Sequence, residues 1–160
     1  MLEIRDLVVS YGAIEAVRGI TLTAAPAAIT AIVGANGAGK SSLMRAVSGL
    51  APVRSGQILL DGKDITTVSA SRRSQLGLAH AMEGRRIFRQ LSVEENLQLA
   101  WQFGRRRNTW ASALERVFTT FPILMEKRRT QAGLMSGGQQ QMLIVSAATI
   151  CNPAYLLLDE

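Results

Sequence analysis

The sequence predicts an α/β fold, because patterns typical of β-strands and of amphipathic helices both occur along the chain. The N-terminal part is rich in strand patterns, the middle is helical, and an apolar run predicts a last strand. In addition, an apolar run at residues 28–33 leads through a glycine-rich segment into a helical pattern that begins near Lys40. We therefore expect an α/β class with an inserted helical segment.

Six segments carry strand patterns: residues 2–11, 14–23, 28–33, 57–60, 76–81 and 154–158. The run at 28–33 is apolar and partly β-branched, and the run at 154–158 is apolar, as strands buried in a parallel sheet are. The Asp61-Gly62 pair is a strong signal for a hairpin turn. The sequence thus predicts two core strands and at least one hairpin.

Five segments carry helical patterns, near residues 40–50, 69–75, 92–104, 111–121 and 138–150. Ser92 and Glu95 have the spacing of a capping box at the start of the third helix. Pro122 and Pro153 are expected to end the fourth and fifth helices. In the first helix, one face carries the apolar side chains and the stop signals follow: Leu43, Met44, Val47 and Leu50, then Gly49 and Pro52.

The composition is that of a globular protein. With 160 residues the chain suits one domain at most, and a hydrophobic content of 48% with 19% charged residues favours a packed core over disorder. No apolar run approaches the roughly 20 residues that a membrane helix needs. Residues 1–6 lack the apolar core of a signal peptide, and the single cysteine, Cys151, allows no internal disulfide. These features predict a cytosolic location.

The net charge of +6 raises the question of a nucleic-acid partner. However, the arginines lie in short dispersed groups, and aromatic residues make up only 5% of the chain, so no stacking surface for bases is visible. The groups are Arg72-Arg73, Arg85-Arg86, Arg105-Arg106-Arg107 and Arg128-Arg129. We interpret most of them as solvated faces, with an anionic membrane surface as another partner for them.

Residues 34–41 fit the phosphate-binding pattern G-x-x-x-x-G-K-[ST] at every fixed position. Glycines let main-chain N–H groups surround a phosphate, and the helix start adds its positive dipole end. Lys40 would contact the β- and γ-phosphates, and the Ser41 hydroxyl would bind Mg²⁺. The expected nucleotide site comprises Gly34, Ala35, Asn36, Gly37, Ala38, Gly39, Lys40, Ser41 and Ser42. A glycine-rich turn with a chance lysine is the less favoured alternative, because the flanking patterns are those that the motif requires.

Two weaker motifs lie in the C-terminal part of the chain. Asp159 and Glu160 follow an apolar run, which suits a strand that delivers two carboxylates to a magnesium-bound nucleotide. Asp159 would support the metal, and Glu160 would be the general base that polarises the attacking water. The segment Ser136-Gly137-Gly138-Gln139 precedes a helix and could present N–H groups to an anion. Taken alone, this segment is better explained as a simple helix cap.

The three motifs, in this order, resemble those of ATP-binding-cassette (ABC) ATPases. Segments 83–88, 93–97 and 133–143 resemble the ATPase subunits of branched-chain amino acid importers, and urea importer subunits are similar. The resemblance implies a P-loop NTPase fold of the ABC ATPase type, with a mixed or antiparallel β subdomain, a RecA-like core and a helical subdomain, incomplete at the C-terminus. It divides the chain into residues 1–82 (β subdomain and phosphate loop), 83–140 (Q-loop and helical subdomain) and 141–160 (signature helix and Walker B strand).

The resemblance also implies roles for single residues. Tyr11 matches the aromatic residue that stacks on adenine, although packing on an edge strand is an alternative. Glu83 matches the Q-loop position that senses the γ-phosphate and Mg²⁺ and contacts the membrane subunit, although it could be a surface acid beside Arg85. Together with Lys40 and Glu160, Glu83 forms the expected catalytic set, and with Ser41 and Asp159 the expected metal set. Four residues would bind the ATP held by an opposite subunit: Ser136, Gly137, Gly138 and Gln139.

By this resemblance, the cofactors are ATP and Mg²⁺, and the partners are a second ATPase subunit, identical or not, and membrane permease subunits. A periplasmic binding protein would act indirectly, no nucleic acid is expected, and the protein would lie on the inner face of the cell membrane. The expected function is to power import of branched-chain amino acids. The alternatives are a urea or other small-solute importer, an inactive nucleotide-binding remnant and, less favoured because the interval between motifs is compact, a DNA-repair ATPase.

The chain departs from the family pattern at several positions. Met82 stands where a proline is usual, and Ala147 where an arginine is usual. The family continues beyond position 160 with a D-loop, a switch histidine and the strand that lies between those of the phosphate loop and of Asp159. His80 precedes the signature segment and is therefore not the switch. We expect a chain of residues 1–160 to fold poorly and to turn over little ATP, because unpaired buried main-chain groups cost about 1–3 kcal/mol each.

Overall fold

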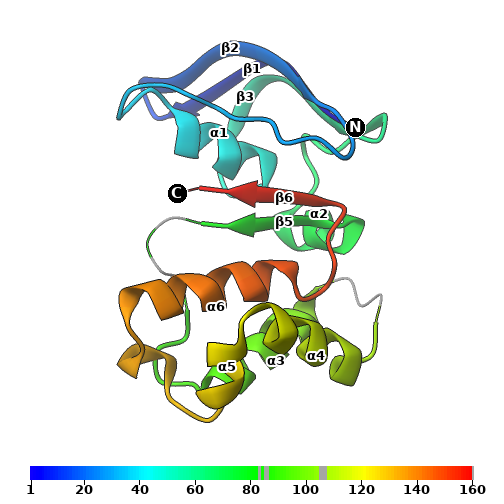
Figure 1. The fold of residues 1–160 in the computed structure, drawn as a ribbon. Helices are drawn as coiled ribbons and strands as arrows, with labels where there is room; N and C mark the ends of the chain where they lie inside the picture. Colours follow the sequence, from blue (N-terminus) through cyan, green and yellow to red (C-terminus); the bar gives the residue numbers. More distant parts are fainter. Residues whose placement is uncertain (83, 85–86, 105–107, 160) are drawn as a thin grey trace. The chain divides into compact units, whose positions relative to one another are not determined.

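The computed structural model describes residues 1–82, 84, 87–104 and 108–159, and it divides into two compact units, Met1–Arg73 and Ser74–Glu160 (Figure 1). The expected α/β class is confirmed, because each unit combines strands with at least one helix. None of the helices among the described residues combines the length and the apolar character needed to cross a membrane.

The first unit is built on a four-stranded antiparallel sheet with the order β2-β1-β3-β4. Its strands are β1 (Leu2–Tyr11), β2 (Ile14–Ala24), β3 (Val53–Leu60) and β4 (Lys63–Asp64). The predicted hairpin at Asp61-Gly62 is confirmed, since both residues have the positive φ, +51° and +77°, that a tight two-residue turn requires. This sheet is the antiparallel β subdomain that the sequence predicts.

Helix α1 (Lys40–Val47) contributes Leu43, Ala46 and Val47 to the core of this unit. They share that core with alternate residues of the strands: Leu2, Ile4, Leu7, Val9, Val17, Ile58 and Leu60. The prediction for Leu50 is wrong, because α1 ends at Val47 and the Leu50 side chain is 50% exposed. Gly49 (φ +79°) reverses the chain after α1, as the stop signal predicts. Helix α2 (Ala70–Leu76) follows and passes from the first unit into the second.

The predicted buried strand at residues 28–33 is absent. Neither of the two sheets formed by the described residues includes this segment, and Ile29 and Val33 are 100% and 92% exposed. A strand is stable only where its N–H and C=O groups pair with a neighbour. An apolar, β-branched run favours a strand but supplies no partner, so here the segment is extended loop.

The second unit contains a two-stranded parallel sheet of β5 (Leu78–Ala81) and β6 (Tyr155–Leu158). Leu78 pairs with Tyr155, and the register continues to Ala81 and Leu158. Both strands were predicted, but β6 is not buried on both faces, since Leu156 and Leu158 are 36% and 52% exposed. The apolar run identified the strand correctly and overestimated its burial, which depends on what covers each face.

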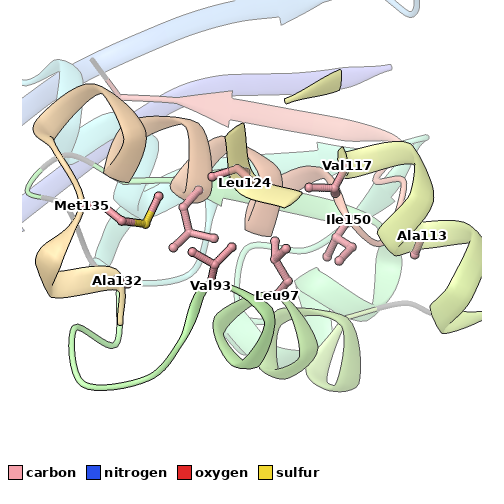
Figure 2. Packing of buried hydrophobic residues seen from close by; sticks show 9 residues of the cluster. Val93, Leu97, Ala113, Val117, Leu124, Ala132, Met135 and Ile150 are labelled. Carbon is pink, nitrogen blue, oxygen red and sulfur yellow. The ribbon is translucent and has the colours of Figure 1, made fainter. Parts of the chain in front are cut away.

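Four helices and a 3₁₀ turn enclose the hydrophobic core of the second unit (Figure 2). They are α3 (Val93–Phe103), α4 (Trp110–Thr120), α5 (Pro122–Glu126), η1 (Ala132–Leu134) and α6 (Gly137–Thr149). Pro122 ends the predicted fourth helix and also begins α5, which the sequence reasoning did not anticipate. The buried cluster consists of Val93, Leu97, Ala113, Val117, Leu124, Ala132, Met135, Leu143 and Ile150.

Two capping boxes define where α3 and α6 begin. Ser92 Oγ accepts a hydrogen bond from the Glu95 N–H at 3.2 Å, and the Ser92 N–H donates to Glu95 Oε2 at 2.7 Å. Ser136 and Gln139 form the same reciprocal pair at the start of α6. The first box was predicted from its spacing, and Ser136 was predicted as an N-cap. Each box satisfies main-chain N–H groups that the first helical turn leaves without partners.

Candidate nucleotide-binding site

The glycine-rich loop at residues 34–39 leads directly into α1. Gly37 and Gly39 have φ values of +82° and +93°, a backbone conformation that residues other than glycine rarely adopt. A Cβ atom at Gly39 would lie 2.2 Å from the carbonyl oxygen of Ala16 in β2. The second fixed glycine of the motif is therefore required by the close approach of the loop to the sheet as well as by its backbone conformation.

Lys40 places its charge within this loop. Its Nζ donates hydrogen bonds to the carbonyl oxygens of Gly34 at 2.9 Å and of Ala35 at 3.0 Å. Lys40 is also the first residue of α1, whose N-cap, Gly39, has no capping side chain. The ammonium group, the positive end of the helix dipole and the loop N–H groups thus gather in one place, which favours an anion.

A pocket of about 670 Å³ lies in the first unit beside this loop. Gly37, Ala38, Gly39 and Lys40 line it, and the other lining residues come from β2, from α1 and from Ile32 and Val33. Among the described residues, Tyr11 does not line this pocket; it ends β1, pairs with Ile14 and is 42% exposed. The ring is thus accessible for stacking, and its role in adenine binding stays a prediction.

The loop residues fit a magnesium-bound nucleoside triphosphate. Glycines of positive φ, an uncapped helix start and a lysine form the donor set that polyphosphates require. Ser41 and Ser42 lie half-buried in the first turn of α1, and a hydroxyl oxygen is a suitable ligand for Mg²⁺. The described residues contain no group of three or more His, Cys, Asp or Glu side chains that could hold a metal by themselves.

The carboxylates expected to assist lie in the second unit. Asp159 follows β6 directly and is 6% exposed, and its N–H donates to the carbonyl oxygen of Ala81 at 3.0 Å. This bond continues the β5–β6 pairing and fixes the backbone of Asp159 at the end of the strand. Glu160 and Glu83, the expected base and Q-loop residue, lie outside the described residues.

The Ser136-Gly137-Gly138-Gln139 segment forms the start of α6. The side chains of Ser136 and Gln139 bond each other's main-chain N–H groups, at 3.4 Å and 3.2 Å. Ser136 and Gly138 are exposed, and a Cβ added at Gly138 would have no described neighbour within 4 Å. The segment thus caps α6. Gly138 leaves open space at this exposed helix start, which an anion bound to another molecule would need in order to approach.

Two buried polar residues near these segments were missed by the sequence reasoning. Gln140 is 5% exposed, and its Nε2 donates to the carbonyl oxygens of Ala132 and Met135 at 3.0 and 3.1 Å. Asn96, which is also 5% exposed, bonds the main-chain N–H and C=O groups of Phe88 in a comparable way. Their signal in the sequence is weak, because a polar residue in the first turns of a helix is normally solvated.

Most of the arginine groups are interpreted above as solvated faces, and Arg73 is an exception. The Arg73 side chain is 2% exposed and donates hydrogen bonds to four main-chain carbonyl oxygens of the first unit. A guanidinium group carries five N–H donors, so it can be buried where several carbonyls converge. Such a convergence comes from the tertiary fold and leaves no local pattern.

Comparison with known proteins identifies the family. A family profile described as "ABC transporter" matches residues 17–160. The chain belongs to the ABC transporter family. Two curated members of this family illustrate the similarity. The high-affinity branched-chain amino acid transport ATP-binding protein BraG of Pseudomonas aeruginosa is 37% identical over 150 residues, covering 94% of this chain and 64% of BraG.

The second relative is the probable branched-chain amino acid transport ATP-binding protein LivF of Archaeoglobus fulgidus. It is 38% identical over 132 residues, covering 82% of this chain and 56% of LivF. The chain thus spans less than two thirds of the length of these ABC relatives. Members named for sulfate or thiosulfate, glycerol-3-phosphate and methionine import also match, at 31–34% identity.

Solved ABC structures share the fold. The ATP-binding subunit of an ABC transporter superposes with a TM-score of 0.87 at 24% identity, covering all of this chain and 66% of that one. A dimeric ATP-binding cassette in a post-hydrolysis state, bound to ADP and phosphate, gives a TM-score of 0.88 at 18% identity and covers 100% and 74%. These similarities support the predicted ABC ATPase fold.

Proposed function

We propose that this chain is the nucleotide-binding part of an ATPase subunit that powers solute import through an ABC transporter. The observation that carries the proposal is the loop at residues 34–39, with its two positive-φ glycines, the Lys40 ammonium group and the uncapped start of α1. This arrangement binds polyphosphate through N–H groups, a helix dipole and a cation. Family membership supports ATP as the nucleotide.

In this proposal Lys40 contacts the β- and γ-phosphates, Ser41 binds the Mg²⁺ that accompanies the nucleotide, and Tyr11 stacks on the adenine. Bound Mg²⁺ neutralises charge that develops on the phosphates during hydrolysis. Asp159 would support that metal. Glu160 accepts a proton from the attacking water, and Glu83 detects the γ-phosphate.

A second subunit completes the site. The exposed start of α6, at Ser136 and Gly138, contacts the ATP held by the opposite subunit in a head-to-tail dimer. Two ATP molecules are then enclosed between two subunits, and hydrolysis reopens the dimer. Dimeric cassettes among the structural relatives support such an assembly.

The membrane partner would be a permease. An apolar groove of about 310 Å³ in the second unit is lined mainly by residues of β5, α3 and α6. Phe88 and Phe103 line it and are 63% and 76% exposed, which is unusual for large aromatic side chains without a partner. We assign this groove to an apolar helix of the permease, which would place the subunit on the cytoplasmic face of the membrane.

Branched-chain amino acids are the proposed cargo, because the BraG and LivF relatives are 37% and 38% identical to the chain. Urea or another small solute is the second candidate cargo. Relatives named for sulfate or thiosulfate import and for methionine import support this alternative. The permease and a binding protein choose the cargo, so the assay has to include them. Uptake of branched-chain amino acids and of urea is measured in cells that lack their own branched-chain importer and produce this subunit with its permease and binding protein.

The nucleotide site is tested with a fluorescent ATP analogue titrated against the purified protein with and without Mg²⁺. We expect saturable binding that Mg²⁺ strengthens and that Lys40→Ala weakens by about a hundredfold, since a charge-assisted contact to phosphate is lost. Lys63→Ala, an exposed substitution on β4 outside this pocket, is the control and should bind as the unchanged protein does. Equal binding by Lys40→Ala and Lys63→Ala would refute the proposed site.

A further inference from the structure

Helix α1 is held at its C-terminal end by one buried side chain. Arg73 Nη1 donates to the carbonyl oxygens of Ala46 and Val47, both at 2.7 Å. These carbonyls belong to the last turn of α1, where the i+4 helical N–H donors are missing. The Ala46 carbonyl oxygen also accepts a hydrogen bond from the Gly49 N–H at 3.0 Å, in the turn that follows α1. A cation at this end is also favoured by the helix dipole. Arg73 therefore satisfies and fixes the end of the helix that is remote from the nucleotide loop.

The same guanidinium group is anchored on its other side. Nε donates to the carbonyl oxygen of Val68 and Nη2 to that of Thr66, both at 2.8 Å. Thr66 is itself attached to the sheet, because its Oγ1 accepts a hydrogen bond from the Ile58 N–H of β3 at 2.9 Å. The result is a continuous hydrogen-bonded connection from β3 through Thr66 and Arg73 to the end of α1.

Charge around the guanidinium group is consistent with this anchoring. Burial lowers the pKa of Arg73 and the charge of Asp64 raises it, but an arginine remains protonated in proteins. Hydrogen bonds from the Thr66 hydroxyl and N–H lower the pKa of Asp64, so this carboxylate is charged near neutral pH. The anchor is thus a permanent cation with a nearby anion.

Packing around Arg73 leaves little freedom for α1 to shift. A Cβ atom at Gly49, just after α1, would lie 3.0 Å from the Ala70 nitrogen and 3.1 Å from Arg73 Nε. The α1 terminus and the start of α2 are therefore in close contact. With eight residues, α1 is only about 12 Å long, so movement of one end displaces the other.

We propose that Arg73 is a positioning residue for the nucleotide site, which acts by fixing the direction of α1 and with it Lys40 and Ser41. This inference rests on the proposed function, because it assumes that the loop binds ATP. A planar group that bonds four carbonyls in two segments determines orientation as well as distance. A lysine would retain the charge but could not span both segments in the same geometry.

The test compares Arg73→Met, Arg73→Lys and the unchanged protein. The fluorescent ATP analogue is titrated with Mg²⁺ at a temperature at which thermal unfolding shows each protein to be folded. We expect Arg73→Met to raise the dissociation constant about tenfold, equivalent to ~1.4 kcal/mol. Arg73→Lys should recover part of the affinity and raise the constant about threefold.

Leu124→Ala is the matched control. It removes a buried side chain of the second unit and lowers stability without touching α1 or Arg73. Its dissociation constant should equal that of the unchanged protein. If Leu124→Ala weakens binding as much as Arg73→Met does, loss of stability explains the effect and the positioning role is refuted.

The remaining outcomes separate this proposal from the proposed function. If the unchanged protein binds no ATP analogue, the proposed function and the positioning role are both refuted. If the unchanged protein and Arg73→Met bind equally well and Lys40→Ala does not bind, only the positioning role is refuted. Should Arg73→Met fail to fold, Arg73→Lys decides: a raised dissociation constant supports the role, and an unchanged one overturns it.

Discussion

The side-chain amide of Asn96 forms hydrogen bonds with both the N–H and the C=O group of Phe88. The Phe88 N–H donates to Asn96 Oδ1 at 2.8 Å, and Asn96 Nδ2 donates to the Phe88 carbonyl oxygen at 3.0 Å. Nδ2 also lies 3.3 Å from the carbonyl oxygen of Leu91 and 2.8 Å from that of Ser92. One buried amide thus fixes the chain from Phe88 to Ser92, just before α3.

Replacing Asn96 with alanine should destabilise this segment. The substitution removes the acceptor of the part-buried Phe88 N–H, which costs about 1–3 kcal/mol. The carbonyls of Phe88, Leu91 and Ser92 lose one hydrogen bond each and keep a main-chain donor. Thermal or urea unfolding measures this loss. Gln98→Ala, an exposed substitution on the same helix, is the control and should change stability by no more than about 0.5 kcal/mol. Equal stability of the two variants would show that the bonds of Asn96 contribute little.

Gly39→Ala should be more damaging than Gly12→Ala. Both glycines have positive φ, +93° and +60°, so both substitutions carry the backbone cost of about 1–2 kcal/mol. Only at Gly39 would the new methyl group meet a main-chain atom, the Ala16 oxygen at 2.2 Å; Gly12 has no described neighbour within 4 Å of that position. Unfolding measurements should therefore separate the two variants, and a larger loss at Gly12 would contradict the close approach of loop and sheet.

Ile29→Asn and Val33→Asn test the exposure of residues 28–33. Both side chains are almost fully exposed, so each substitution should change the free energy of unfolding by no more than about 0.5 kcal/mol. Removing exposed apolar surface should also reduce aggregation, which light scattering measures. Leu43→Ala, a buried substitution in α1, is the comparison and should cost about 2–5 kcal/mol. A comparable cost at Ile29 or Val33 would mean that the segment is a buried strand after all.

Glu95 makes the stability of α3 dependent on pH. The hydrogen bond from the Ser92 N–H to its carboxylate lowers the pKa of Glu95, with a further contribution from the Ser92 side chain. A group with a lowered folded pKa adds stability above its unfolded value of about 4.3. That stability is lost as the pH falls through the lower folded value.

Glu95→Gln isolates this contribution, because glutamine keeps an acceptor oxygen for the capping box and does not titrate. We expect the unchanged protein to lose stability relative to Glu95→Gln as the pH is lowered from about 6 towards 3. Urea unfolding at a series of pH values measures the difference. Parallel curves over this range would show that the carboxylate has the same pKa in the folded and unfolded chains.

Local patterns in the sequence predicted most of the elements correctly. Ser92 and Ser136 begin α3 and α6, and the Asp61-Gly62 turn joins β3 to β4, because caps and tight turns depend on residues that are neighbours in the chain. The phosphate loop was predicted for the same reason. Its glycine conformations and the start of α1 at Lys40 follow from eight consecutive residues.

The errors concern groups whose partners are distant in the sequence. Arg73 is an arginine in a polar segment, and its burial depends on carbonyls at Ala46 and Val47, more than 20 residues away. Residues 28–33 have the composition of a core strand, and their exposure reflects the lack of a pairing strand among the described residues.

The sequence alone therefore determined the type of most elements, the position of the nucleotide loop and the family. The tertiary structure decided which of those elements are buried, why Gly39 must be a glycine, and that Arg73 anchors the helix that carries Lys40. The physical reason is that propensity, capping and turn chemistry act between neighbouring residues. Burial and close approach require partners that only the folded chain brings together.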